Sequence, residues 1–181
     1  FIVFNDWTYP HFCRLLEELQ VESQPTRMSF SVRDERSGLE YNGHSLGTLF
    51  AQRRNLLRPG FYRMLADILR FNRQARRLAS RPDDHTSVAQ FLARGRYSRA
   101  FAQHYLLPMG AAIWSCPPGT FAQFPLQFIA RFYQQHGLLN LLRRPTWRVV
   151  RGGARTYVQA LARRLRGRVR LQTPVARVRR F

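Results

Sequence analysis

The order of apolar and polar positions predicts helices along most of the chain. After Thr8-Tyr9-Pro10, apolar side chains recur at helical spacing at Phe12, Leu15 and Leu19. Thr can cap a helix and Pro is tolerated in its first turn, so we expect a helix that ends near Gln20. Further helical patterns cover residues 45–80, 86–92, 98–107 and 125–136. The middle of the chain is therefore predicted to be helical.

The longest helical pattern is interrupted at Arg58-Pro59-Gly60, because Pro disrupts a helix interior. The helix after this break is amphipathic. One face carries Phe61, Leu65, Ile68, Leu69, Asn72 and Ala75, and a ridge on the other side carries Arg63, Arg70 and Arg77. Such a ridge is most often a solvated face, and docking on an anionic membrane is the alternative. Pro108 and Gly137 are expected to end later helices.

Strand patterns lie at two places. Residues 28–42 alternate around the turn formers of 34–38, which predicts a β-hairpin. In the tail, strands are predicted at 147–150, 168–171 and 175–178, with a Gly152-Gly153 turn and a helix over 154–165 between the first two. The whole pattern favours a helix-rich α+β fold.

The charge is strongly positive and uneven. The formal net charge is +20, and all 30 basic residues are Arg. The ten acidic residues lie at or before Asp84, so residues 85–181 carry 17 Arg and no carboxylate. This balance suggests a basic module that binds nucleic acid or a membrane surface. The complete absence of Lys weakens that reading, because Lys serves phosphate binding as well as Arg does.

Other sequence features narrow the class of protein. Cys13 and Cys116 are too few for a disulfide scaffold, and the five His are not spaced as metal ligands, so no metal site is predicted. No segment has the length of a membrane span or the layout of a signal peptide. We expect a cytoplasmic protein that touches the inner membrane face at most peripherally.

The tail carries the clearest likeness to a known family. Residues 147–153 read Trp-Arg-Val-Val-Arg-Gly-Gly, and residues 169–175 read Val-Arg-Leu-Gln-Thr-Pro-Val. This succession resembles the segment of flavin amine oxidases, protoporphyrinogen oxidases and carotenoid desaturases in which a Gly-Gly turn opens a helix and a strand re-enters the FAD domain. The resemblance implies that Gly152 and Gly153 belong to the cofactor side. It also implies that Val175 contacts the FAD adenine through its backbone.

The start of the chain supports the same resemblance. Residues 1–5 read Phe-Ile-Val-Phe-Asn, which resembles the stretch that follows the flavin-contacting glycine segment of this family. The resemblance implies that Phe1, Ile2 and Val3 lie near the flavin and that Phe4 lines the substrate cavity. Phe-Ala-Gln-Arg-Arg-Asn at 50–55 also resembles a bacterial subgroup of predicted flavoprotein amine oxidoreductases.

Residues 107–115, Leu-Pro-Met-Gly-Ala-Ala-Ile-Trp-Ser, are similar to the same subgroup. Judged from its residues alone, this small and apolar segment packs against a neighbour or lines a cavity with about equal weight. The resemblance favours the cavity. The residues then expected to line it are Met109, Gly110, Ala112, Ile113 and Trp114. Phe124, Phe128, Phe132 and Tyr133 are expected in the core.

The resemblance also implies how the chain is organised. Residues 1–7 would leave the FAD domain, 8–146 would form a substrate-side domain, and 147–181 would return to the FAD domain. No G-x-G-x-x-G occurs, although that loop holds the pyrophosphate in dinucleotide-binding folds. We expect an internal piece that needs the missing FAD-binding segments of its parent and is inactive alone.

The sequence thus predicts part of an FAD-dependent oxidase, dehydrogenase or desaturase. Its substrate is a small molecule, an amine or an apolar lipid- or isoprenoid-like compound, and no nucleic-acid partner is expected. No residue pattern marks a general base, which this class tolerates because the flavin carries the chemistry. The alternatives are the basic binding module and a helical interaction domain without a cofactor.

Overall fold

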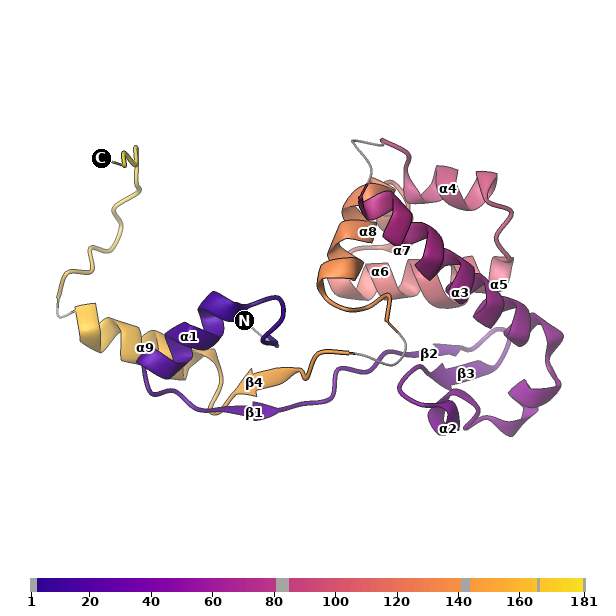
Figure 1. Ribbon diagram of the computed structural model, residues 1–181, viewed down its shortest axis with the longest axis horizontal. Coiled ribbons are helices and arrows are strands. Elements are labelled where there is room, and N and C mark those ends of the chain that lie inside the picture. The colour runs from indigo at the N-terminus through magenta and orange to yellow at the C-terminus, as the bar shows by residue number, and fades with distance from the viewer. Residues whose placement is uncertain (1–2, 81–84, 141–143, 166, 181) are drawn as a thin grey trace. The chain divides into compact units, whose positions relative to one another are not determined.

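The computed structural model describes residues 3–80, 85–140, 144–165 and 167–180 (Figure 1). The chain divides into a terminal unit, Phe1–Arg27 with Thr146–Phe181, and a central unit, Met28–Pro145. The sequence predicts that the first domain boundary follows residue 7, whereas in the structure residues 8–27 also belong to the terminal unit. The assignment of the units to flavin and substrate stays a prediction.

The terminal unit is built on a short antiparallel pair of strands, β1 (Ser23–Pro25) and β4 (Arg148–Val150). Ser23 pairs with Val150 and Pro25 with Arg148. Phe4 extends the pairing through an isolated bridge to Arg148. A small core of Phe4, Leu16 and Val150 is buried beneath helices α1 (Pro10–Glu18) and α9 (Ala154–Leu165). The rings of Phe12 and Tyr157 pack edge to face on each other at 5.3 Å.

The start of α1 differs in one respect from the prediction. Pro10 occupies the first turn as expected, but Tyr9 is the N-cap residue and makes no capping hydrogen bond with its side chain. The prediction that Thr8 caps this helix was wrong. Asn5 Oδ1 instead accepts a hydrogen bond from the Thr8 N–H at 2.9 Å, so an acceptor from the preceding turn pairs an N–H at the helix entry.

The tail agrees with the prediction only as far as α9, whose bounds are the predicted ones. Residues 168–171 and 175–178 form no strand in the described chain. Leu171, Val175 and Val178 are exposed to about four-fifths of their surface. The strand predictions for these residues were therefore wrong for this structure, because an apolar alternation makes a strand only where a second strand supplies hydrogen-bond partners.

The central unit begins with the predicted hairpin. Strands β2 (Ser31–Asp34) and β3 (Leu39–Asn42) pair in register, with Asp34 opposite Leu39. The carboxylate of Asp34 accepts the N–H groups of Arg36 and Ser37 and so fixes the turn. The Ser37 hydroxyl also donates to this carboxylate. These hydrogen bonds lower the pKa of Asp34, and the one from the Ser37 hydroxyl has the largest effect.

Helices form the remainder of the central unit. The hairpin is followed by α2 (Leu46–Leu49), the 3-10 helix η1 (Arg53–Leu57), α3 (Pro59–Ala79), α4 (Val88–Arg94), α7 (Pro118–Phe121) and α8 (Leu126–Gln135). Ser87 caps α4 through a capping box, and α8 packs along α3. In the part of the chain that the structure describes, no helix is long and apolar enough to cross a membrane. The observed fold is helix-rich with two small sheets, which is compatible with α+β.

The buried face of α3 is rotated from the predicted one. Phe61, Asn72 and Ala75 are buried as expected, but Leu69 is half-exposed. The core side is completed instead by Met64, Asp67 and Phe71. Met64, Asp67, Phe71 and Ala75 follow Phe61 at spacings of three and four residues and so share its face of the helix.

The arginine ridge of α3 is not one uniform solvated face. Asp67 is buried and accepts a hydrogen bond from the Ser98 N–H at 2.8 Å. Arg63 and Arg70 form ion pairs with its carboxylate at 3.7 and 3.2 Å. Arg70 also lies over the Tyr97 ring, 3.9 Å from its centroid. Only Arg77 of the ridge extends freely from the helix within the described chain.

A continuous helix runs through Pro108, where the sequence predicted an end. Its parts are α5 (Arg99–Phe101), the π-helix η2 (Ala102–Leu106) and α6 (Leu107–Trp114). In an α-helix the His104 carbonyl would pair with the N–H of residue 108, which Pro lacks. The wider π-turn accommodates the ring, and the Tyr41 hydroxyl donates to the His104 carbonyl at 2.6 Å.

Candidate functional site

The residues expected on the flavin side lie in the terminal unit. Phe1 and Ile2 fall outside the described residues. Val3 is half-buried, and Phe4 is 2 % exposed with its ring edge to face against Phe12 at 5.0 Å. Phe4 exchanges two backbone hydrogen bonds with Arg148, at 3.0 and 2.8 Å. Its side chain therefore belongs to a core, and it offers almost no surface to a cavity within this unit.

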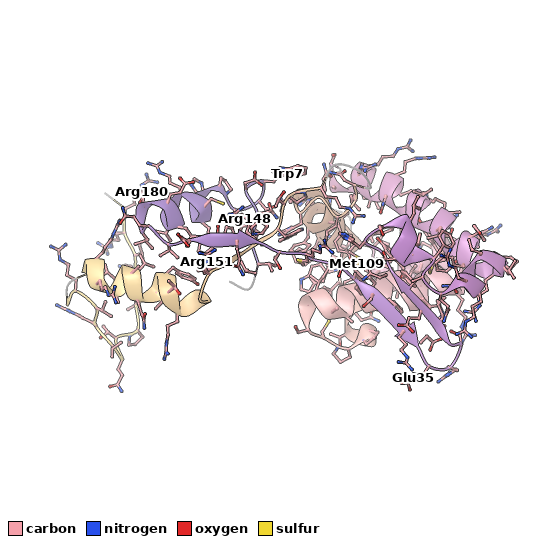
Figure 2. All side chains as sticks on the ribbon, turned by 90° about the horizontal axis from the view of Figure 1, so that it is seen from below. Trp7, Glu35, Met109, Arg148, Arg151 and Arg180 are labelled. Carbon is pink, nitrogen blue, oxygen red and sulfur yellow. The ribbon has the colours of Figure 1, made fainter. Side chains whose placement is uncertain are left out.

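Arg148 anchors the ladder that holds Phe4. Its guanidinium donates to the hydroxyl and to the carbonyl of Ser23, both at 2.9 Å. Figure 2 labels Arg148 and Arg151, which come from the same end of the chain. Arg151, the residue directly after β4, forms an ion pair with Glu22 at 2.6 Å. Both contacts join β4 to the segment around β1. Sequence reasoning missed this pairing, because the partners lie more than a hundred positions apart.

Gly152 and Gly153 form the turn between β4 and α9, as predicted. Their φ angles are +76° and +79°, the left-handed region where a side chain is strained. A Cβ at Gly152 would lie 2.8 Å from the Thr156 hydroxyl, whereas a Cβ at Gly153 would meet nothing within 4 Å. The backbone at Gly153 is thus open to the approach of another group.

Val175 lies in the extended tail and is 78 % exposed. Its backbone N–H and C=O form no hydrogen bond with the rest of the described chain. An unpaired backbone suits a residue that would contact a cofactor through its main chain, and the open Gly153 suits close approach. Within the described residues the terminal unit forms no complete phosphate cradle, and contacts of Gly153 and Val175 with a dinucleotide stay predictions.

Asn5 is a buried polar residue that sequence reasoning did not single out. It is fully buried, and its backbone carbonyl oxygen accepts a hydrogen bond from the Tyr9 N–H at 3.1 Å. Within the described residues its Nδ2 has no hydrogen-bond partner. A polar residue directly after a short extended segment and three positions before Thr8 is a turn-capping signal that could have revealed it.

The residues expected at the substrate cavity lie on or beside α6 in the central unit. Met109 and Gly110 face inward, Ala112 is exposed, and Ile113 and Trp114 are half-buried. A Cβ at Gly110 would lie 2.1 Å from the Phe121 ring. The close approach that this glycine permits is therefore made by Phe121.

Trp114 is the centre of a partly exposed aromatic surface. Its ring lies 5.9 Å from Phe124, 5.8 Å from Phe128 and 4.9 Å from Phe132. We call these four side chains the Trp114 surface. Phe128 is 49 % exposed, so the prediction that it belongs to the core was wrong. α6 and α8 bring these rings together because Trp114 ends one helix and the other three rings lie on or just before the second.

The side of the Trp114 surface that faces the interior is packed by two further aromatic rings. Phe121 and Tyr133 stack on Trp114 from within, at 5.6 and 6.3 Å. The Tyr133 hydroxyl is buried without a hydrogen-bond partner among the described residues, and burial raises its pKa well above the ordinary value. Burial also raises the pKa of Tyr105, to about 12. These phenols stay neutral near neutral pH and do not supply a base.

Similarity to known proteins covers almost the whole chain. A search of curated proteins finds no match to it. The family model described as "Flavin containing amine oxidoreductase" matches residues 1–180. This match agrees with the likeness first read from the Gly-Gly turn and the 107–115 segment, and it supports a flavin cofactor at the level of the family. The chain belongs to the flavin-containing amine oxidoreductase family.

Proposed function

We propose that this chain forms the substrate side, and part of the FAD-binding side, of an FAD-dependent oxidoreductase. The enzyme would pass a hydride from an amine or from an apolar, lipid-like molecule to the flavin. The central unit would supply the substrate wall, and the terminal unit would supply backbone contacts to FAD. The segments that grip the dinucleotide phosphates would lie outside these 181 residues, since the chain contains no G-x-G-x-x-G.

The Trp114 surface is the observation that carries this proposal. A set of rings with a half-exposed Phe128 can hold an apolar or aromatic group and exclude water from it. The faces of such rings also attract a cationic amine. The second half of the chain contains no carboxylate that could capture an amine instead. Both substrate classes therefore suit the same wall.

The flavin and the protein would have separate roles in the reaction. The bound flavin supplies the electron-accepting ring, and the protein supplies orientation and a dry surface. In this chain, Trp114 and Phe128 would orient the substrate. Val175 would contact the cofactor through its unpaired backbone, and Gly153, whose N–H and C=O pair with Val150 and Thr156, would let the cofactor approach because a Cβ there would meet nothing within 4 Å.

Anaerobic mixing of the full-length, FAD-loaded protein with candidate substrates tests the proposal. We expect the flavin band to bleach with members of one class, alkyl or aryl amines or isoprenoid chains. Trp114→Leu should slow bleaching at least roughly tenfold, because it removes the centre of the surface. Tyr62→Leu, an exposed aromatic residue on α3, should leave the rate unchanged. A colourless full-length protein that takes up no FAD would refute the proposal.

A separate pair of variants tests the cofactor contact at Val175. Val175→Pro removes the backbone N–H, whereas Val175→Ala keeps it. Loss of one hydrogen bond of about 1–1.5 kcal/mol predicts roughly tenfold weaker retention of FAD in the Pro variant only. Equal retention by both variants would place the contact elsewhere.

The basic-module alternative makes a different prediction. Binding of mixed-sequence nucleic acid or anionic vesicles would fall steeply as salt rises, because released counterions drive such association. Under the proposal we expect the FAD-loaded protein to show no such binding at physiological salt. Strong, salt-sensitive binding by a flavin-free protein would favour the alternative.

A further inference from the structure

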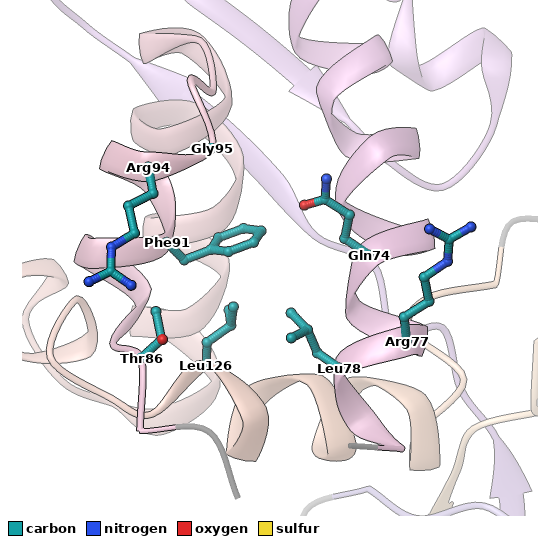
Figure 3. A pocket seen from close by; sticks show the side chains of 8 residues that line it. All are labelled: Gln74, Arg77, Leu78, Thr86, Phe91, Arg94, Gly95 and Leu126. Carbon is teal, nitrogen blue, oxygen red and sulfur yellow. The ribbon is translucent and has the colours of Figure 1, made fainter. Parts of the chain in front are cut away.

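A cavity of about 390 Å³ opens in the central unit between α3 and α4. Its floor is apolar and is made by Leu78 from α3, Phe91 from α4 and Leu126 from the start of α8 (Figure 3). Leu126 is 2 % exposed, so this floor continues into the core. The volume lies in the range of ordinary small-molecule sites.

The rim of this cavity is positively charged. Arg77 on α3 and Arg94 on α4 stand on opposite sides of the cavity with their guanidinium groups turned away from each other (Figure 3), and neither guanidinium forms an ion pair or hydrogen bond within the described chain. Gln74 lines the same rim. Its Oε1 accepts a hydrogen bond from the Tyr97 hydroxyl at 2.8 Å, which leaves its amide N–H groups as donors. No carboxylate is among the described lining residues.

We propose that this cavity binds a medium-length alkyl chain that ends in a carboxylate. The alkyl chain would cover Leu78, Phe91 and Leu126. The carboxylate would lie at the rim, where the exposed side chains of Arg77 and Arg94 would turn toward it. Guanidinium groups bind carboxylates through paired, charge-assisted hydrogen bonds, which a neutral or cationic head group cannot accept in the same way. None of these residues belongs to the Trp114 surface or to the FAD contacts proposed above, so this is a second small-molecule site.

Isothermal titration of the full chain with decanoate, decan-1-ol and decylamine tests the head group. We expect decanoate to bind at least roughly tenfold more tightly than the alcohol, as one or two charge-assisted hydrogen bonds predict. Decylamine should bind most weakly. From hexanoate to decanoate the affinity should rise, by at most about fourfold for each methylene group.

Matched double variants separate the site from the general positive charge of the protein. Arg77→Gln with Arg94→Gln should weaken decanoate at least roughly tenfold and leave decan-1-ol unchanged. Arg53→Gln with Arg73→Gln makes the same change in net charge on exposed arginines that do not line the cavity, and should leave both affinities unchanged. All four positions are exposed, so the thermal midpoints of both double variants should match that of the parent.

Three results would overturn the inference. They are equal binding of the three head groups, an affinity that does not change with chain length, and equal loss in the two double variants. The last would show that the overall field, and not the rim, attracts the carboxylate. Each result leaves the flavin assays as they are, because those assays probe other residues.

Discussion

At the scale of single residues, Tyr41 shows how one hydroxyl supports an unusual helix. It is buried at 3 % exposure and donates to the carbonyl that Pro108 deprives of its usual α-helical partner. Burial raises the pKa of this phenol, so the hydroxyl keeps its proton and remains a donor at neutral pH. Its role is therefore to pair a buried backbone group, and it does not act as a base.

Tyr41→Phe should lower the free energy of unfolding by about 1–2 kcal/mol, because it removes a buried hydrogen-bond donor and fills almost the same volume. Urea denaturation of both proteins measures the difference. Tyr62→Phe is the control: its hydroxyl donates to the Leu56 carbonyl at 3.1 Å but is exposed, so less than about 0.5 kcal/mol is expected. Equal losses in the two variants would contradict this role of Tyr41.

Gly110→Ala should destabilise the protein by about 1–3 kcal/mol or more, because the new methyl group would overlap the buried Phe121 ring. Gly119→Ala is the matched control, since a Cβ there meets nothing within 4 Å and its φ is not left-handed. That change should be neutral or slightly stabilising, by up to about 1 kcal/mol. Thermal unfolding compares the two, and a stable Gly110→Ala protein would show that Gly110 does not set the packing.

At the scale of elements, the sequence predicted correctly those helices and turns whose position depends only on residues within or next to them. The bounds of α9, the break before α3 at Pro59 and the Asp34 turn of the hairpin all follow from periodicity and turn chemistry within a few positions. β1 was missed because its partner, β4, lies more than a hundred residues away. The tail strands failed for the same reason, since no pattern within a segment reveals whether a second strand lies beside it.

The candidate site was predictable to a similar extent. The Gly152-Gly153 turn was located by its sequence, since two successive glycines mark a backbone that other residues resist. The rings around Trp114 were identified one by one, but their grouping depends on how α6 meets α8. The roles of Val3, Val175 and the α6 residues toward cofactor and substrate stay predictions.

The entry to α1 offers a test at this scale. Asn5→Ala should reduce the free energy of unfolding by about 0.5–2 kcal/mol, because it removes the acceptor for the Thr8 N–H, as loss of a helix cap does. Asn42→Ala removes a similar hydrogen bond, to the His44 N–H at 2.8 Å, from an exposed turn and should cost less. Urea denaturation followed by far-ultraviolet circular dichroism measures both variants against the parent. A larger effect for Asn42 would refute the ranking.

At the scale of the whole molecule, the buried phenols predict a loss of stability in alkali. Burial raises the pKa of Tyr105 from 10.0 to about 12 and also raises those of Tyr41 and Tyr133. The folded state thus holds protons that the unfolded state releases above pH about 10. This contribution is complete below pH 10 and is lost as the pH rises through 12.

Urea denaturation at a series of pH values from about 8 to 12 measures this loss. The free energy of unfolding should fall increasingly steeply above pH 10, and Tyr105→Phe should make the slope shallower, because one titrating group is removed. Arginine stays protonated over this range and adds no slope of its own. An identical slope in the variant would show that Tyr105 does not titrate with unfolding.

The π-turn at Ala102–Leu106 has a consequence for the direction of the Trp114 surface. Each residue advances an α-helix by about 100° around its axis, and a π-turn inserts one residue into the count. Deletion of a single residue from this turn would swing everything that follows by roughly that angle, which would carry Trp114 away from Phe128 and Phe132. The direction in which the proposed substrate wall faces is therefore set by one additional residue, about two turns of helix before Trp114.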